Sequence, residues 1–187
     1  VEVLGGTPDA ARRAGRVAVM PQSDGIDPDF PVSVSDVVAQ GRYGRLGLTR
    51  RLSPDDREAV ADALARVQLT ELAERPIAAL SGGQRRRTFV ARALAQQAEV
   101  LLLDEPYAGV DVVSERLIAD VLADLAAAGA TVLVSTHDLS TLPDRADRVL
   151  LLARRLVADG PPDEVLAPEV LARAFGLPRD VAGSDAS

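Results

Sequence analysis

The sequence predicts an α/β fold in which a parallel sheet carries an inserted α-helical segment. Three short apolar runs indicate buried strands: residues 16–20, 99–103 and 131–135. Residues 33–97 have helical apolar spacing throughout, and residues 111–128 are spaced as one long amphipathic helix before Gly129. Strands that alternate with helices are typical of a parallel sheet.

Local signals place the elements before the third strand. Residues 1–4 are expected to form a strand that ends at Gly5 and Gly6, and Thr7 and Pro8 mark the start of a short helix to Arg13. A loop is expected over residues 23–31. Residues 53–56, Ser-Pro-Asp-Asp, combine a cap, a proline and first-turn acids, which is a strong helix start.

After residue 137 the predicted elements are short. A helix over residues 139–145 comes first, followed by a strand pair and two further helices. The strand pair covers 148–152 and 156–158, and the helices cover 161–166 and 168–175. Residues 176–187 have the composition of a loose tail.

Length and composition narrow the class of protein. The chain of 187 residues fits one domain, or a core with an inserted subdomain, and its 47% hydrophobic residues suffice for a real core. It has no cysteine, so a disulfide framework is absent and a reducing compartment is plausible. The net charge of −7 argues against a nucleic-acid surface. No apolar run approaches the ~20 residues of a membrane span, and the N-terminal residues lack the pattern of a signal peptide.

Two adjacent carboxylates end the second predicted strand. Asp104 and Glu105 follow the apolar run, and Pro106 stops it. Parallel sheets place their chemistry at the carboxyl ends of strands. There a carboxylate can hold hydrated Mg²⁺, and its neighbour can take a proton from an attacking water. The plainer interpretation is a strand followed by an acidic turn.

A glycine pair opens the helical stretch before that strand. Gly82 and Gly83 let the backbone approach a ligand, while Ser81 and Gln84 supply hydrogen-bonding side chains. A helix N-terminus just after a glycine pair favours an anion.

His137 follows the third predicted strand. It is the only histidine of the chain and is expected at the same sheet edge as Asp104 and Glu105. A lone histidine is more often structural than functional. A functional role for His137 is therefore inferred only from its expected position at the edge that holds Asp104 and Glu105.

These stretches, in this order, resemble the ATP-binding subunit of an ABC transporter. The matching segments are residues 20–22 (MPQ, similar to the Q-loop), 80–84 (LSGGQ), 101–106 (LLLDEP), 108–111 (AGVD) and 135–138 (STHD). The resemblance covers about residues 1–175. It implies a P-loop NTPase (RecA-like) core with an inserted helical subdomain, divided into residues 1–32, 33–97, 98–175 and a tail, 176–187.

The resemblance implies a site shared by two subunits that sandwich two ATP molecules head to tail. Asp104 would order Mg²⁺ with the help of Gln22, Glu105 would be the general base, and His137 would contact the γ-phosphate. Asp111 would act across the dimer interface. The residues expected to reach the ATP bound on the partner are Ser81, Gly82, Gly83 and Gln84.

The implied partners are a second ATP-binding subunit and a membrane permease, with the chain peripheral to the cytoplasmic face of the plasma membrane. Residues 30–34 and 41–44 resemble subunits of manganese, zinc and iron importers. No nucleic-acid partner is expected, and the run Arg85-Arg86-Arg87 is interpreted as a solvated face. A soluble ABC ATPase of translation or DNA repair is disfavoured because tandem domains and coiled-coil insertions are absent.

One part of the family pattern is not found. The phosphate loop, G-x-x-x-x-G-K-[ST], needs a lysine, and all 21 basic residues here are arginine. We therefore expect that Val1 falls inside the domain, that the first strand and phosphate loop are absent, and that a strand is missing beside 131–135. This would leave unpaired backbone and exposed apolar surface. Whether the chain is an ATP hydrolase thus stays open. The alternative is a non-catalytic partner subunit that presents the LSGGQ segment in trans to an intact ATPase.

Overall fold

The computed structural model describes residues 1–22, 31–46 and 51–176. It divides into two compact units, Val1–Thr136 and His137–Ser187, each with its own apolar cluster. The predicted loop over residues 23–31 and the predicted tail therefore lie largely outside the described residues. The predicted division into residues 1–32, 33–97, 98–175 and 176–187 stays a prediction.

A parallel sheet forms the centre of the first unit. Its described strands are β1 (Val17–Met20), β2 (Val100–Asp104) and β3 (Thr131–Ser135), in the order β1-β2-β3. Met20 is paired with Leu103, and Asp104 with Ser135. The predicted parallel sheet is confirmed, and its register brings the carboxyl ends of β2 and β3 side by side.

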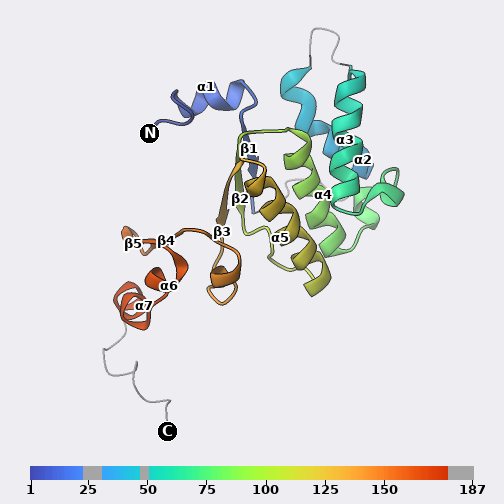
Figure 1. The fold of residues 1–187 in the computed structure, drawn as a ribbon. Coiled ribbons are helices and arrows are strands. Elements are labelled where there is room, and N and C mark those ends of the chain that lie inside the picture. Colours follow the sequence, from blue (N-terminus) through green and yellow to red (C-terminus); the bar gives the residue numbers. More distant parts are fainter. Residues whose placement is uncertain (23–30, 47–50, 177–187) are drawn as a thin grey trace. The chain divides into compact units, whose positions relative to one another are not determined.

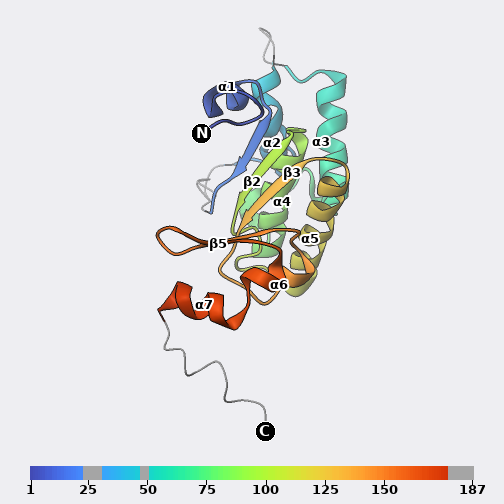
Figure 2. The same cartoon turned by 60° about the vertical axis from the view of Figure 1, so that its left-hand side comes forward.

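Two helices cover one face of this sheet, α4 (Gly82–Ala95) and α5 (Val112–Ala127) (Figures 1 and 2). Because successive side chains of a strand point to opposite faces, Leu101 and Leu103 of β2 are buried in the same core as these helices. On the alternate positions, Val19 of β1 and Leu133 of β3 are each 51% exposed. No strand in the described part of the chain pairs with the outer edge of β3. The face of the sheet opposite these helices thus carries exposed apolar side chains, while the missing strand beside β3 stays a prediction.

The predicted helical segment is confirmed as a series of helices whose apolar side chains share one core with α4. It contains α2 (Val34–Ala39), η1 (Gln40–Arg45), α3 (Pro54–Arg66), η2 (Thr70–Leu72) and η3 (Ile77–Ala79). Capping boxes start two of them, because Ser33 with Asp36 and Ser53 with Asp56 satisfy each other's backbone N–H groups.

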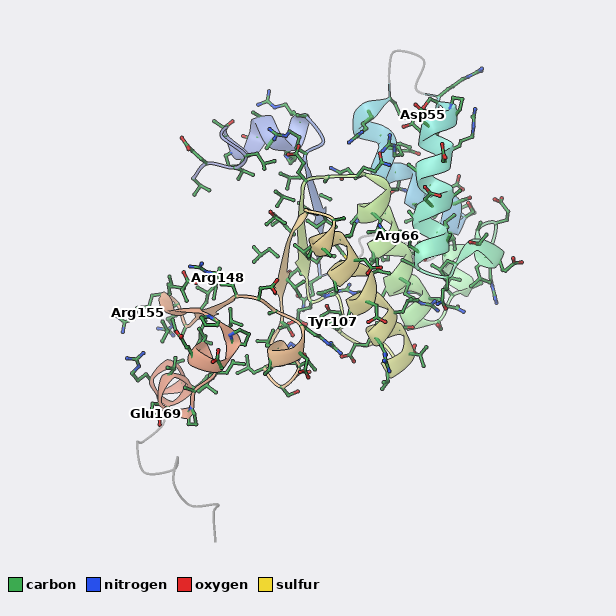
Figure 3. All side chains as sticks on the ribbon, viewed as in Figure 1. Asp55, Arg66, Tyr107, Arg148, Arg155 and Glu169 are labelled. Carbon is green, nitrogen blue, oxygen red and sulfur yellow. The ribbon has the colours of Figure 1, made fainter. Side chains whose placement is uncertain are left out.

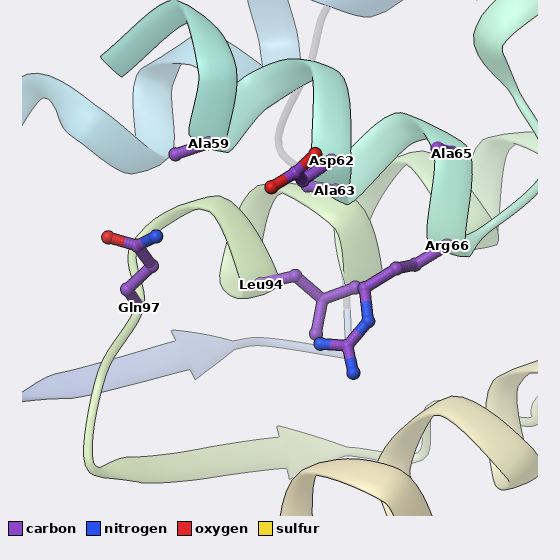
Figure 4. A pocket seen from close by; sticks show the side chains of 7 residues that line it. All are labelled: Ala59, Asp62, Ala63, Ala65, Arg66, Leu94 and Gln97. Atoms are coloured by element: carbon purple, nitrogen blue, oxygen red, sulfur yellow. The ribbon is translucent and has the colours of Figure 1, made fainter. Parts of the chain in front are cut away.

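A buried ion pair joins η1 to α3. Arg42 donates to Asp56 at 2.8 Å, and its guanidinium also reaches Ala95 O and Gln97 Oε1, each at 2.9 Å. The neighbouring glycine permits this packing, since a Cβ on Gly41 would lie 2.2 Å from a backbone oxygen of α4. A groove of about 370 Å³ lies between α3 and α4 (Figure 4). The residues that line the groove are Ala59, Asp62, Ala63, Ala65, Arg66, Leu94 and Gln97, none of them a predicted site residue.

The start of the chain corrects one prediction. Residues 1–4 form no strand; an isolated bridge joins Val3 to Gly6, with Val3 N to Gly6 O at 2.9 Å and the reverse bond at 3.1 Å. Leu4 and Gly5 have positive φ, so the chain turns back at once and leaves no length for a strand. The helix that follows, α1 (Pro8–Arg13), is confirmed with Thr7 as its N-cap.

The second unit contains the predicted strand pair, β4 (Val149–Leu152) and β5 (Leu156–Gly160), and the helices α6 (Pro162–Val165) and α7 (Pro168–Phe175). Arg148 and Arg155 of the hairpin are labelled in Figure 3. The predicted helix over 139–145 is wrong: only η4 (Leu142–Asp144) forms. Pro143 lacks the N–H that a continuing helix needs, and Asp138 holds the preceding turn through Ser140.

Candidate functional site

The exposed carboxylate of Asp104 stands at the carboxyl end of β2. It accepts a hydrogen bond from the hydroxyl of Ser135, its register partner on β3. Sequence reasoning missed Ser135 as a site residue. Its position could have indicated it, because Ser135 is a polar residue at the end of the strand that neighbours β2 in a parallel sheet.

Glu105, the next residue, has left-handed backbone with φ of +48°. That conformation costs a non-glycine residue about 1–2 kcal/mol, so neighbouring contacts must hold it. Its amide donates to the backbone oxygen of Ser135 at 3.1 Å and to Ser135 Oγ at 3.2 Å. Its carbonyl accepts from the amide of Ala108 at 3.1 Å. Strand β2 therefore ends in a tight turn that redirects Glu105, which is half-buried.

Arg86 of α4 binds the backbone of this turn. Its guanidinium donates to the carbonyls of Asp104 (2.9 Å), Glu105 and Pro106 (3.3 Å). It also donates to the carbonyl of Gln22 at 3.1 Å. Arg86 is only 7% exposed, so the expectation of a solvated face for the arginine run is wrong at this position. The reason is helical geometry, which turns Arg86 toward the sheet.

The LSGGQ segment forms the start of α4. Ser81 is the N-cap, and its hydroxyl accepts from the amide of Gln84 at 3.2 Å. The side chain of Gln84 accepts in return from the amide of Ser81 at 3.0 Å. Both side chains that were predicted to face a ligand thus also form a capping box. Ser81 and Gly82 are exposed, and Gly83 is buried.

Asp111 lies beside that helix start and caps α5. Its carboxylate accepts from the amide and the hydroxyl of Ser114, each at 2.9 Å. These hydrogen bonds lower the pKa of Asp111 from its usual value. The bond from the Ser114 amide has the larger effect, and the bond from its hydroxyl comes next. A Cβ on Gly83 would lie 2.4 Å from Asp111 Oδ2 and 2.6 Å from Ser114 Oγ. The LSGGQ helix and the AGVD segment therefore touch within one chain.

His137 is the first residue of the second unit and is exposed. Glu105 belongs to the other compact unit, so the expected place of His137 beside it stays a prediction. Within the first unit, Arg86 at the start of α4 binds the backbone of Gln22, Asp104 and Glu105. Asp111 joins this group because it lies against Gly83 of the same helix.

The residues present suit Mg²⁺. That ion is usually bound by one or two carboxylates, with water and phosphate oxygens completing its shell. Asp104 supplies an exposed carboxylate, and Gln22, an amide residue, is attached to the same guanidinium through its backbone. Among residues 1–22, 31–46 and 51–176, no group of three or more His, Cys, Asp or Glu side chains could hold a metal ion by itself. Water and phosphate oxygens would therefore have to complete the shell of a bound Mg²⁺.

Comparison with known proteins identifies the class. The sequence profile of the ABC transporter family matches residues 5–108. This chain therefore belongs to the ABC transporter family, as an ATP-binding domain. No helix in the described ranges is both long and apolar enough to cross a membrane.

The names of several relatives include a metal. The manganese transport system ATP-binding protein MntA of Synechocystis is 43% identical over 94% of this chain. MntB of Bacillus subtilis, named for the same kind of system, is 47% identical over 86%. The chelated iron transport system membrane protein YfeB of Yersinia pestis is 43% identical over 89%. The chain spans 68%, 64% and 56% of these relatives' own lengths.

Solved structures agree on the fold. A metal-chelate type ABC transporter in an inward-facing conformation matches 87% of this chain and 64% of its own, with a TM-score of 0.79 and 32% identity. The ATP-binding cassette MJ1267 in its ADP conformation has a TM-score of 0.73 at 20% identity and shows the fold alone.

Proposed function

We propose that this chain is the ATP-binding and ATP-hydrolysing part of an ABC importer for a metal ion. The observation that carries the proposal is the turn after β2. There Asp104 presents an exposed carboxylate oriented by Ser135, and Glu105 follows in a backbone held by Ser135 and Arg86. The names of the relatives, which specify manganese and chelated iron, support metal import.

Each residue has a distinct task in this proposal. Glu105 takes the proton of the attacking water, and Asp104 with Gln22 holds the Mg²⁺ hydration shell. Mg²⁺, when bound, neutralises charge on the phosphates. His137 positions the water against the γ-phosphate. The segment Ser81–Gln84 contacts ATP held on a second subunit, with Gly82 and Gly83 allowing close approach, and Asp111 acts across the same interface.

The turnover of the native protein, purified with its membrane partner, tests this assignment. Glu105→Gln is expected to lower ATP turnover at least about 100-fold, because a general base contributes 10²–10⁴-fold. Glu99→Gln is the matched control: Glu99 precedes the other end of β2, pairs with Arg16 at 2.6 Å, and should change turnover little. Equal effects of the two variants would contradict the role of Glu105.

Metal import has its own readout. Cells that lack the gene should accumulate less of one divalent metal, measured by elemental analysis, and Glu105→Gln should reproduce the loss. Unchanged content of manganese, iron and zinc would remove the metal from the proposal and leave the ATPase role intact.

The isolated 187-residue chain should bind ATP very weakly and hydrolyse none, because no lysine is available to hold the phosphates. Measurable turnover by this chain, abolished by Glu105→Gln, would contradict that expectation.

The absence of lysine also favours a second candidate, a non-catalytic partner that presents Ser81–Gln84 to an intact ATP-binding subunit. The exposure of Ser81 and Gly82 at the start of α4 suits this role. Mixing the chain with an intact homologous subunit tests it. Ser81→Arg in this chain should suppress any turnover gained on mixing, and unchanged turnover would end the idea.

A further inference from the structure

One buried guanidinium joins three segments that are distant in the sequence. Arg86 leaves α4 and donates to the carbonyls of three consecutive residues, Asp104, Glu105 and Pro106. Its remaining Nη group donates to the carbonyl of Gln22, just beyond β1. The same side chain therefore links the LSGGQ helix, from which it projects, to the acidic turn and the Q-loop segment.

These contacts suit the chemistry of arginine. A guanidinium carries five N–H donors in a fixed plane, so a single side chain can satisfy several carbonyls at once. Burying the charge is costly unless its donors are paired. At 7% exposure, the positive charge of Arg86 thus depends on these carbonyls staying where they are.

The turn needs such support. Glu105 has a φ of +48°, which non-glycine residues avoid, and its carbonyl accepts from both Arg86 and Ala108. Without Arg86, the carbonyls of Asp104 and Pro106 would each lose a donor. The backbone of Glu105 would then be free to relax toward ordinary extended or helical angles.

We propose that Arg86 is a positioning residue for ATP hydrolysis: it holds the left-handed turn at Glu105 and ties that turn to Gln22. The reaction part of this inference rests on the proposed function, whereas the holding of the turn does not. The sequence alone concealed it, since Arg86 stands in a run of three arginines.

Amide hydrogen exchange of the chain, without nucleotide, tests the holding role. In Arg86→Met the amides of Glu105 and Ala108, which are hydrogen-bonded in the turn, should exchange about tenfold faster, the effect of one lost charge-assisted hydrogen bond. Amides of α3 should not change once an osmolyte has equalised the global stability of variant and wild type. Equal acceleration everywhere, or none at the turn, would overturn the proposal.

Two further variants sharpen the measurement. Arg86→Lys keeps the charge but offers a single ammonium, so it should restore protection only partly. Arg85→Met is the matched control, because Arg85 precedes Arg86 in α4 and donates no hydrogen bond to the turn in the described structure. If Arg86→Met fails to fold, the comparison of Arg86→Lys with Arg85→Met decides.

ATP turnover of the native assembly tests the reaction part. Arg86→Lys should lower kcat about tenfold while KM stays within about twofold, since the positioned group acts in the chemical step. An unchanged kcat together with faster exchange at the turn would reject the role in hydrolysis. If even wild-type turnover does not depend on Glu105, the proposed function fails instead, and local exchange would still assign Arg86 to the turn.

Discussion

Gly83 and Asp111 lie so close that a side chain on the glycine would collide with the carboxylate. A Cβ atom added to Gly83 would lie 2.4 Å from Asp111 Oδ2. Asp111 cannot move aside cheaply, because both its oxygens are bound to Ser114 at 2.9 Å. The second glycine of the LSGGQ segment is thus required by packing within one chain, besides any contact with a ligand.

Gly83→Ala is therefore expected to lower the free energy of unfolding by about 1–3 kcal/mol, the usual cost of overpacking. Gly82→Ala is the control, since among the residues that the structure describes a Cβ there would meet only Gly109 O, at 3.5 Å. That substitution should be neutral, or stabilising by up to about 1 kcal/mol through helix propensity. Urea unfolding of both variants measures the difference, and equal stabilities would show that the Gly83 contact yields easily.

The cap itself can be tested apart from the packing. Asp111→Ala removes the acceptor for the amide of Ser114 and should cost about 0.5–2 kcal/mol. Asp111→Asn keeps a carbonyl oxygen at the same place and should retain most of the stability. Thermal unfolding followed by circular dichroism distinguishes the two. A loss for asparagine as large as that for alanine would mean that the charge, which both variants lack, matters more than the hydrogen bond.

Elements with strong local signals were predictable from the sequence. The cap and proline at Ser53 and Pro54 start α3 as expected, and Gly129 follows α5 with positive φ. The strands were found because each is a short apolar run between turn signals. Asp104 and Glu105 were placed at the end of a parallel strand for the same reason.

What the sequence could not show depends on contacts between distant segments. Arg86 differs from its arginine neighbours through the carbonyls it binds, which lie 18 to 20 residues away at the turn and 64 residues away at Gln22. Ser135 becomes part of the site only through the register of β2 with β3. Residues 1–4 were expected to form a strand that ends at the glycines, but the chain already turns at Leu4 and Gly5, where φ is positive. Sequence patterns indicate the periodicity of helices and strands, whereas these features depend on tertiary contacts and on the local backbone.

Acid should weaken the contact between η1 and α3. The pKa of Asp56 is lowered to about 2 by the Ser53 backbone hydrogen bond first, and then by Arg42. A folded-state pKa below the unfolded value of about 3.9 means that unfolding takes up a proton. The contribution of Asp56 is therefore complete above the unfolded pKa and is lost as the pH falls through 2.

The experiment compares wild type with Asp56→Ala in urea between pH 6 and pH 2. The variant leaves Arg42 buried without its carboxylate, so the gap in unfolding free energy should be about 3–5 kcal/mol near pH 6. The gap should narrow toward pH 2, where wild type also loses the charge. A gap independent of pH would show that the ionised carboxylate is not what stabilises the pair.

The open face of the sheet gives the last prediction. Leu133 and Leu103 occupy neighbouring strands, but Leu133 is 51% exposed and Leu103 only 3%. The same change to alanine should therefore cost about 2–5 kcal/mol at Leu103, where it leaves a cavity. At Leu133 it should cost less than about 1 kcal/mol, as for other exposed strand positions. Urea unfolding of the two variants of this chain measures both costs under one set of conditions. If Leu133→Ala proves as costly as Leu103→Ala, then some part of the chain covers this face in solution, and the exposed apolar surface is not a feature of the folded protein.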